Sequence, residues 1–301
     1  MSGYAQQAGL GEVITAVVTP FQADGTVALD RFQELARHLV DNGSDGLVVC
    51  GTTGESPTLS DDEKLALFAA AVEAVGDRGS VIAGTGTYST AHSVHLTEQA
   101  ESLGVDGFLV VYPYYSKPPM RGFVEHVRAL AAATDKPLVI YNIPVRTVTC
   151  VDTATFAELA EIPNVTAVKQ AHDDLEQARA IVELGLELYA GDDAILLPHL
   201  ELGGRGVISV TAHVAGPQTK RLVEAFRAGD RARAEALNRE LQPAFDLLKV
   251  QVNPIPIKAA LNLLGHDVGG HRLPLVEASD EEVAAVRACL ERLGVLEPAP
   301  A

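Results

Sequence analysis

Eight short apolar runs, separated by segments of helical periodicity, constrain the fold of this 301-residue chain more than any other feature. Nearly all of the runs lack an internal polar alternation, as expected for strands that are buried on both faces. This α/β alternation is typical of parallel strands joined by crossover helices, and eight such units predict a closed (β/α)8 TIM barrel. The expected strands cover residues 13–18, 46–49, 81–83, 107–111, 138–141, 165–169, 188–190 and 206–210.

Beyond the eighth run the pattern becomes purely helical, with candidate helices over residues 218–228, 231–250, 255–264 and 280–293. Barrels of about 250 residues form one domain, so closure of the barrel does not require this tail. We therefore expect a barrel over residues 1–228 and a C-terminal helical extension over residues 229–301. The extension is interpreted as a packing collar or an oligomer contact rather than as part of a catalytic site.

Charge and hydropathy exclude several classes of protein. The formal net charge of -17 repels nucleic acid phosphate and anionic lipid, and no stripe of lysine and arginine offsets it. No apolar run approaches the roughly 18 residues that cross a bilayer, and the start of the chain lacks the basic and apolar regions of a secretory signal. We expect a cytoplasmic protein that binds neither nucleic acid nor membrane.

A loop after the second expected strand has the composition of an anion site. In a TIM barrel, active sites lie at the C-terminal ends of the strands, so the residues that follow each strand are the ones to compare. Gly51-Thr52-Thr53-Gly54-Glu55 offers two hydroxyls and several backbone N–H groups in a tight turn, which suits a small carboxylate. Taken alone, the loop is better explained as a turn capped by threonines.

Phenols and a guanidinium follow the next strands along the same rim. Tyr115 belongs to a cluster of tyrosines after the fourth expected strand, in a chain with seven tyrosines. Tyr141 ends the fifth strand, and Arg146 follows in the next loop. Arginine is the natural bidentate partner of a substrate carboxylate, although each tyrosine taken alone is explained equally well by packing.

Lys169, at the end of the sixth expected strand, is the most informative position in the chain. Burying an unpaired ammonium is costly, so a lysine that points into a barrel is rarely structural; the alternative is a side chain that extends to the rim to reach water. Burial lowers a lysine pKa and gives a free amine, which attacks a ketone to form an imine. With Tyr141, Thr53 and Tyr115 to move protons, this set predicts an amine-dependent aldolase.

The seventh expected strand is followed by Gly191-Asp192-Asp193, where phosphate-binding barrels commonly place an anion site. Two carboxylates oppose a phosphorylated substrate, and we interpret them as helix caps, with cation binding as the alternative. The nine histidines make no trio with the rim carboxylates, and the three cysteines are too scattered for a zinc cluster or a disulfide framework. Because no dinucleotide-binding glycine motif follows a strand either, we expect no metal and no organic cofactor.

Together, these residues resemble the dihydrodipicolinate synthase and N-acetylneuraminate lyase superfamily of class I aldolases, and the match covers almost the whole chain. The loop at residues 51–56 is similar to the family's pyruvate-carboxylate loop, and the segment at 141–144 to the one that carries its proton-relay tyrosine. Lys169 matches the imine-forming lysine, and residues 206–211 match the eighth-strand signature. The resemblance implies that substrate is bound by Thr52, Thr53, Gly191 and the backbone of Ile208.

Within this superfamily, three features resemble the synthase branch: the pair Thr52 and Thr53, Tyr115, and Arg146. The resemblance implies that Tyr115 reaches the site of a neighbouring subunit and that Arg146 binds the carboxylate of a second substrate. The small-molecule substrates would be pyruvate and L-aspartate 4-semialdehyde, in lysine and diaminopimelate biosynthesis. The implied assembly is a homotetramer of paired dimers.

Two departures from the family pattern concern the acceptor side of the site. Val148 stands two residues beyond Arg146, where glycine is common, and Gln170 follows Lys169, where an acidic residue is usual. The sequence therefore gives less support for the identity of the acceptor aldehyde than for the chemistry with pyruvate.

Feedback by lysine is expected to be weak or absent. Members that lysine inhibits carry histidine, asparagine and glutamate in the allosteric cleft, whereas the matching positions here are Asp61, Lys64, Tyr88 and His92. Loss of the glutamate removes a partner for the ammonium group of the effector.

Two other functions compete with this interpretation. The first is a different aldolase or lyase of the superfamily, acting on 2-keto-3-deoxygluconate or N-acetylneuraminate; Arg146 and the paired threonines argue against it. The second is a barrel that binds a ligand without catalysis, because a fold alone does not fix a function. The intact set of Lys169 and Tyr141 argues against the second alternative.

Overall fold

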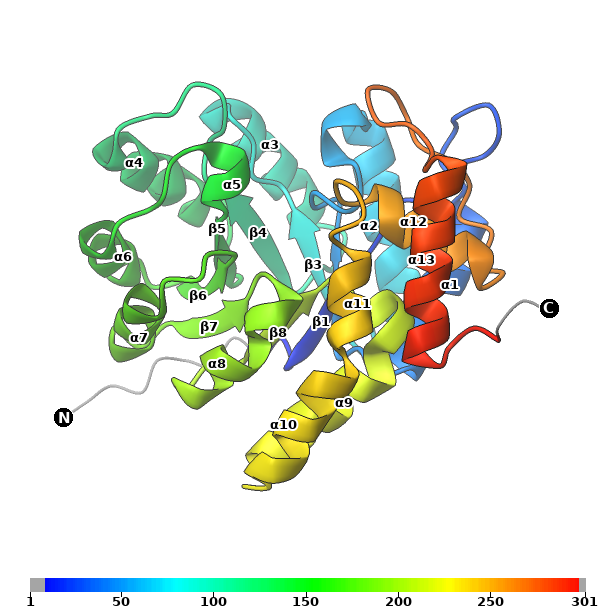
Figure 1. Cartoon of the computed structure of the whole chain (residues 1–301). Helices are drawn as coiled ribbons and strands as arrows, with labels where there is room; N and C mark the ends of the chain where they lie inside the picture. Colours follow the sequence, from blue (N-terminus) through cyan, green and yellow to red (C-terminus); the bar gives the residue numbers. More distant parts are fainter. Residues whose placement is uncertain (1–8, 298–301) are drawn as a thin grey trace.

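In a computed structural model, which describes residues 9–297, eight parallel strands close into one barrel in the order in which they occur along the chain (Figure 1). The closing pair joins the first strand to the last, with Ile14 opposite Ile208. All eight predicted strands and the predicted (β/α)8 fold are confirmed. The strands are β1 (Val13–Ala16), β2 (Gly46–Val49), β3 (Ser80–Gly84), β4 (Gly107–Val111), β5 (Leu138–Asn142), β6 (Val165–Gln170), β7 (Glu187–Ala190) and β8 (Gly206–Ser209).

Helices surround the barrel, and two of them begin with a complete capping box. Ser60 and Glu63 form this reciprocal pair of hydrogen bonds in α2, and Ser279 and Glu282 form it in α13. The helices that follow the first seven strands are α1 (Leu29–Asp41), α2 (Asp61–Val75), α3 (Thr90–Glu101), α4 (Met120–Ala131), α5 (Pro144–Thr147), α6 (Thr153–Ala160), α7 (Leu175–Glu183) and α8 (Leu196–Glu201). Short 3-10 turns, η1 (Ser56–Thr58) and η2 (Asp193–Ile195), follow β2 and β7.

Two apolar clusters make up the core. The larger cluster lies between the strands and the surrounding helices, and the smaller one fills the barrel interior. The interior cluster includes Tyr141 and Ile208, so the barrel is packed below its C-terminal rim. This packing leaves the rim as the place for a site.

The helix after β8 is α9 (Ala212–Arg227), and the C-terminal extension consists of α10 (Arg231–Glu240), α11 (Gln242–Leu247), α12 (Ile255–Leu263) and α13 (Asp280–Leu293). The prediction of a single helix over residues 231–250 is wrong, because the helix is interrupted between α10 and α11. Pro243 stands in the first turn of α11, where its missing N–H costs nothing, and it could not occupy a helix interior. The extension then returns to the barrel, where α11 contacts η2 beside the rim (Figure 1).

Within residues 9–297, no helix combines the length and the apolar character that crossing a membrane requires. Residues 1–8, on which most of the expectation of no secretory signal rests, lie outside the described residues. Cys50, Cys150 and Cys289 are all free thiols.

Candidate active site at the C-terminal rim of the barrel

Lys169 ends in the barrel mouth as a buried amine. Its side chain is 4% exposed, and its Nζ lies 4.3 Å from the centre of the Tyr141 ring, which the pairing of β5 with β6 places directly opposite. No group among residues 9–297 accepts a hydrogen bond from this ammonium. Burial lowers the pKa of Lys169 to about 8; the carboxylate of Asp193 opposes this shift, and the guanidinium of Arg146 adds to it. The direction is the one that imine chemistry requires.

Tyr141 stays protonated at neutral pH. Burial raises the pKa of its phenol to about 12, against the lowering effects of Arg146 and of a side-chain hydrogen bond with Thr52. A protonated phenol beside a free amine can donate a proton and take it back, as a proton shuttle must. In this structure Thr52, rather than Thr53, makes the contact with that phenol.

Thr53 is the buried threonine of the loop between β2 and η1. Its Oγ1 accepts a hydrogen bond of 2.9 Å from Asn253 Nδ2, a residue of the C-terminal extension. The loop is held from below as well, since the Thr19 hydroxyl donates to the Gly54 carbonyl at 2.7 Å. The two neighbouring threonines therefore have different partners.

Arg146 stands on α5 at the exposed rim, and its Nη2 donates to the backbone carbonyl of Asn253 at 3.3 Å. Val148, two residues further on, has a φ of 64°, which is unfavourable for a β-branched side chain and common for glycine. The backbone thus makes a glycine-type turn although the residue is valine. Val145 and Val148 are both exposed beside the guanidinium.

The two carboxylates in the turn after β7, whose role the sequence left open between capping and cation binding, have different partners. Asp192 caps η2 by accepting from the Ala194 N–H at 3.0 Å, which confirms the capping interpretation for this residue. Asp193 is buried and binds the end of β8 instead, accepting from the hydroxyl of Thr211 at 2.8 Å and from the backbone N–H of Val210 at 2.9 Å. Within the described residues, no group of three histidine, cysteine or acidic side chains is arranged to hold a metal ion.

A cavity of about 370 Å³ joins most of the predicted residues. Thr52, Thr53, Tyr141, Arg146, Lys169 and Gly191 all line it. Gly191 has no room for a side chain, because a Cβ would lie 2.8 Å from the backbone nitrogen of Ala171. A second cavity, of about 230 Å³, extends the site past Tyr141 and Arg146 toward Tyr114.

Two predicted residues lie outside this cavity. The Ile208 side chain packs in the barrel interior, and Tyr115 is 94% exposed on the loop after β4. One chain alone therefore does not bring Tyr115 to Lys169. The backbone φ of Tyr115 is 67°, which is outside the usual range for a residue other than glycine.

The family model described as the dihydrodipicolinate synthetase family matches residues 9–293. The chain belongs to this family. The family resemblance expected from the rim motifs is therefore confirmed.

Individual relatives match this chain over nearly their whole length. The chain is 53% identical over 289 residues to the 4-hydroxy-tetrahydrodipicolinate synthase of Moorella thermoacetica, covering 95% of this chain and 99% of that one. Its fold matches that of dihydrodipicolinate synthase from Cyanidioschyzon merolae with lysine bound, with a TM-score of 0.94, 42% identity and coverage of 97% and 100%. The chloride-inhibited enzyme from Acinetobacter baumannii complexed with pyruvate matches with a TM-score of 0.92, 34% identity and coverage of 95% and 100%.

The C-terminal extension contributes to the site, beyond the collar that the sequence analysis expected. Phe245, Leu248 and Asn253 line the cavity beside Lys169. Asn253 directly precedes α12, and its position in the sequence gives no sign of which barrel loop it reaches.

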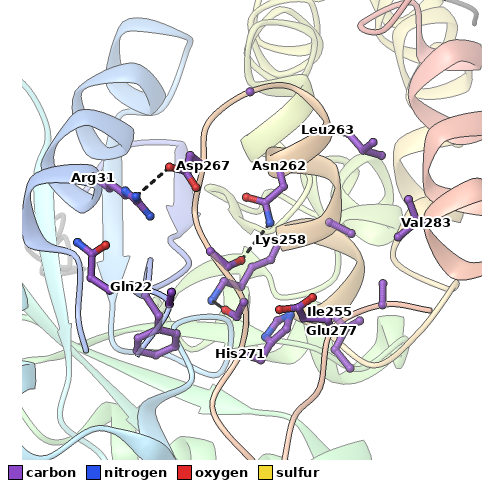
Figure 2. Close-up of a pocket in the computed structure, with 17 residues that line it drawn as sticks. Gln22, Arg31, Ile255, Lys258, Asn262, Leu263, Asp267, His271, Glu277 and Val283 are labelled. Carbon is purple, nitrogen blue, oxygen red and sulfur yellow. Dashed lines mark hydrogen bonds and ion pairs between the residues drawn. The ribbon is translucent and has the colours of Figure 1, made fainter. Parts of the chain in front are cut away.

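The extension also holds the carboxylate at the end of the threonine loop. Glu55 is buried and accepts hydrogen bonds of 3.0 Å from Lys258 Nζ and from His271 Nδ1. Although burial opposes it, these two partners hold the pKa of Glu55 below its usual value. Figure 2 shows Lys258 and His271 among the residues that line a neighbouring cavity of about 710 Å³, where Arg31 pairs with Asp267.

Proposed function

We propose that this chain is a 4-hydroxy-tetrahydrodipicolinate synthase like its relatives and condenses pyruvate with L-aspartate 4-semialdehyde in lysine and diaminopimelate biosynthesis. The observation that carries the proposal is the buried Lys169 amine, with a pKa of about 8 and without a hydrogen-bond acceptor, in one cavity with Tyr141 and Arg146. The protein is then a lyase that forms a Schiff base and needs no organic cofactor.

The first half of the reaction concerns pyruvate. The free amine of Lys169 attacks the ketone carbon, and the carbinolamine loses water to give the protonated imine. Tyr141 supplies and removes the protons of this step, with Thr52 hydrogen-bonded to its phenol. Thr52, Thr53 and Gly191 would surround the bound pyruvate, with the backbone of Ile208 below it.

The second half joins the two substrates. Loss of a proton from the methyl group turns the imine into an enamine, because the iminium nitrogen accepts the electron pair. The enamine carbon then attacks the aldehyde, whose carboxylate binds the guanidinium of Arg146. The exposed Arg146 lies at the open side of the cavity, where a second substrate enters.

Assembly and location are part of the same proposal. Tyr115 after β4, and Val145 and Val148 after β5, are large exposed side chains, which favours contact with a second copy of the chain. In such a dimer Tyr115 reaches the neighbouring site and completes the proton relay, and two dimers make the homotetramer. The enzyme acts in the cytoplasm, where its small-molecule substrates are found.

Turnover of pyruvate and L-aspartate 4-semialdehyde, coupled to a reductase that consumes NADPH, tests the proposal. We expect turnover that stops when either substrate is omitted. Absence of turnover, with a pyruvate imine still trapped on Lys169 by borohydride, would mean that the aldehyde is a different one, and 2-keto-3-deoxygluconate and N-acetylneuraminate would then be tested in the cleavage direction. No imine at all would overturn the aldolase assignment.

A further inference from the structure

Asn253 touches both halves of the candidate site although it belongs to the extension. Its side-chain Nδ2 donates to Thr53 Oγ1 at 2.9 Å, and its backbone carbonyl accepts from Arg146 Nη2 at 3.3 Å. The residue also lines the cavity that contains Lys169. It is therefore the point where the pyruvate side and the aldehyde side of the site meet.

The hydrogen bond from Asn253 makes the Thr53 hydroxyl an acceptor, in contrast to three other threonines whose hydroxyls donate to backbone carbonyls. Thr19, Thr58 and Thr147 all donate their hydroxyl protons to backbone carbonyls. Within residues 9–297, Thr53 has no such acceptor, and one lone pair of its oxygen is occupied by the Asn253 amide. Its single proton is thus left to be donated into the cavity.

The Asn253 side chain keeps this orientation at a cost. Its Oδ1 is buried and has no hydrogen-bond partner among the described residues. A buried unpaired oxygen is destabilising, so the amide contributes little to folding beyond its bond to Thr53. The backbone is fixed nearby, because Lys258 on the following helix is held by Glu55 at the other end of the threonine loop.

We propose that Asn253 is a positioning residue that makes Thr53 a hydrogen-bond donor toward bound pyruvate, while its backbone carbonyl holds Arg146 for the aldehyde. The inference rests on the proposed function for the identity of the substrates. It assigns the side chain to the pyruvate half of the reaction alone, because Arg146 is held by the backbone.

Asn253→Ala in the full-length protein tests the inference, with borohydride trapping of the pyruvate imine on Lys169 and steady-state kinetics as readouts. We expect the rate of imine formation to fall about tenfold, while KM for the aldehyde stays within about twofold of the parent value. Asn238→Ala is the matched control, because Asn238 also buries an unpaired side-chain oxygen but lies on α10 and does not line the cavity. The control should change neither readout.

A double-mutant cycle separates positioning from a merely structural role. If Asn253 acts through Thr53, then Asn253→Ala lowers the imine rate in the parent protein and has no further effect in Thr53→Val. Should Asn253→Ala fail to fold, Asn253→Asp keeps the shape and removes the donor, and the same cycle applies. Additive losses, or an unchanged imine rate, would overturn the inference. If the protein traps pyruvate but does not turn over the aldehyde, only the proposed acceptor is wrong. The inference about Asn253 is still tested, because the cycle measures the rate of imine formation with pyruvate.

Discussion

The molecule buries two lysines against aromatic rings, and only one of them is arranged to react. Lys169 is 4% exposed, with its Nζ 4.3 Å from the centre of the Tyr141 ring. Lys258 is 1% exposed, with its Nζ 4.4 Å from the centre of the Phe21 ring. Burial lowers the pKa of both. Neither burial nor the ring therefore distinguishes the reactive amine from the structural one.

The difference lies in the hydrogen-bond acceptors around each ammonium. Lys258 donates to Glu55 Oε1 and to the Thr19 carbonyl, both at 3.0 Å, and also to the Gly270 carbonyl, so all three of its protons are taken. Lys169 has none of these bonds among residues 9–297. Acceptors stabilise the charged form of an ammonium, whereas an ammonium without acceptors loses a proton, and so gains a lone pair, more readily. In the proposed function, these missing acceptors leave the Lys169 amine available as the nucleophile.

Replacing each lysine by methionine should separate the two roles, and the largest effect is expected at Lys169. Lys169→Met removes the only group that forms the imine, so turnover should fall at least about 10³-fold. Thermal stability should be unchanged or higher, because an unpaired buried amine is removed. Mass spectrometry after borohydride treatment with pyruvate and a thermal melt check both points. A pyruvyl adduct on the variant would show that another amine is the nucleophile.

The matching variant Lys258→Met should affect folding instead. It leaves the Glu55 carboxylate buried without its cation, which costs about 3–5 kcal/mol of unfolding free energy. Urea denaturation measures the loss, and adding Glu55→Gln to the same chain should recover part of it. At a temperature where the variant is folded, Lys169 should still trap pyruvate. A loss below about 1 kcal/mol would mean that the cluster contributes only what a surface pair does.

The pH dependence of imine formation tests whether the pKa of Lys169 is lowered. With the Lys169 pKa at about 8, the free-amine fraction rises about tenfold per pH unit below 8 and levels off above it. The rate of pyruvate trapping should follow that curve. A rate that continued to climb to pH 10 would indicate that the pKa of Lys169 stays near the ordinary value of about 10.4 for a lysine.

A third buried lysine gives the smallest expected effect. Lys64 is buried with its Nζ 3.5 Å from Asp61 Oδ1, and His92 Nε2 donates to the same carboxylate at 2.8 Å. Because Lys64 and His92 already occupy the Asp61 carboxylate, that carboxylate is not free to bind the ammonium of a lysine effector, so millimolar lysine should change turnover by less than about twofold. Half-inhibition at submillimolar lysine, measured in the coupled assay, would contradict the prediction.

Some features of the site were within reach of sequence reasoning and others were not. Lys169 and Tyr141 end adjacent strands, so the rule that active sites lie at the C-terminal rim was enough to bring them together. Asp192 and Asp193 look equivalent in sequence, yet one caps η2 and the other binds β8, because the turn directs neighbouring side chains to opposite sides. The helix predicted over residues 231–250 was wrong because Pro243 cannot donate the backbone hydrogen bond that a continuous helix requires at its position.

The sequence by itself determined the barrel, the rim and the position of the reactive lysine, since strand periodicity and strand ends are local properties of the chain. Only the tertiary structure decided which lysine is unpaired. The bond from Lys258 to Glu55 spans 203 positions, and the bond from Asn253 to Thr53 spans 200. No local pattern predicts such contacts, because they depend on how the extension packs back onto the barrel, and that packing neutralises one buried charge and leaves the other free to react.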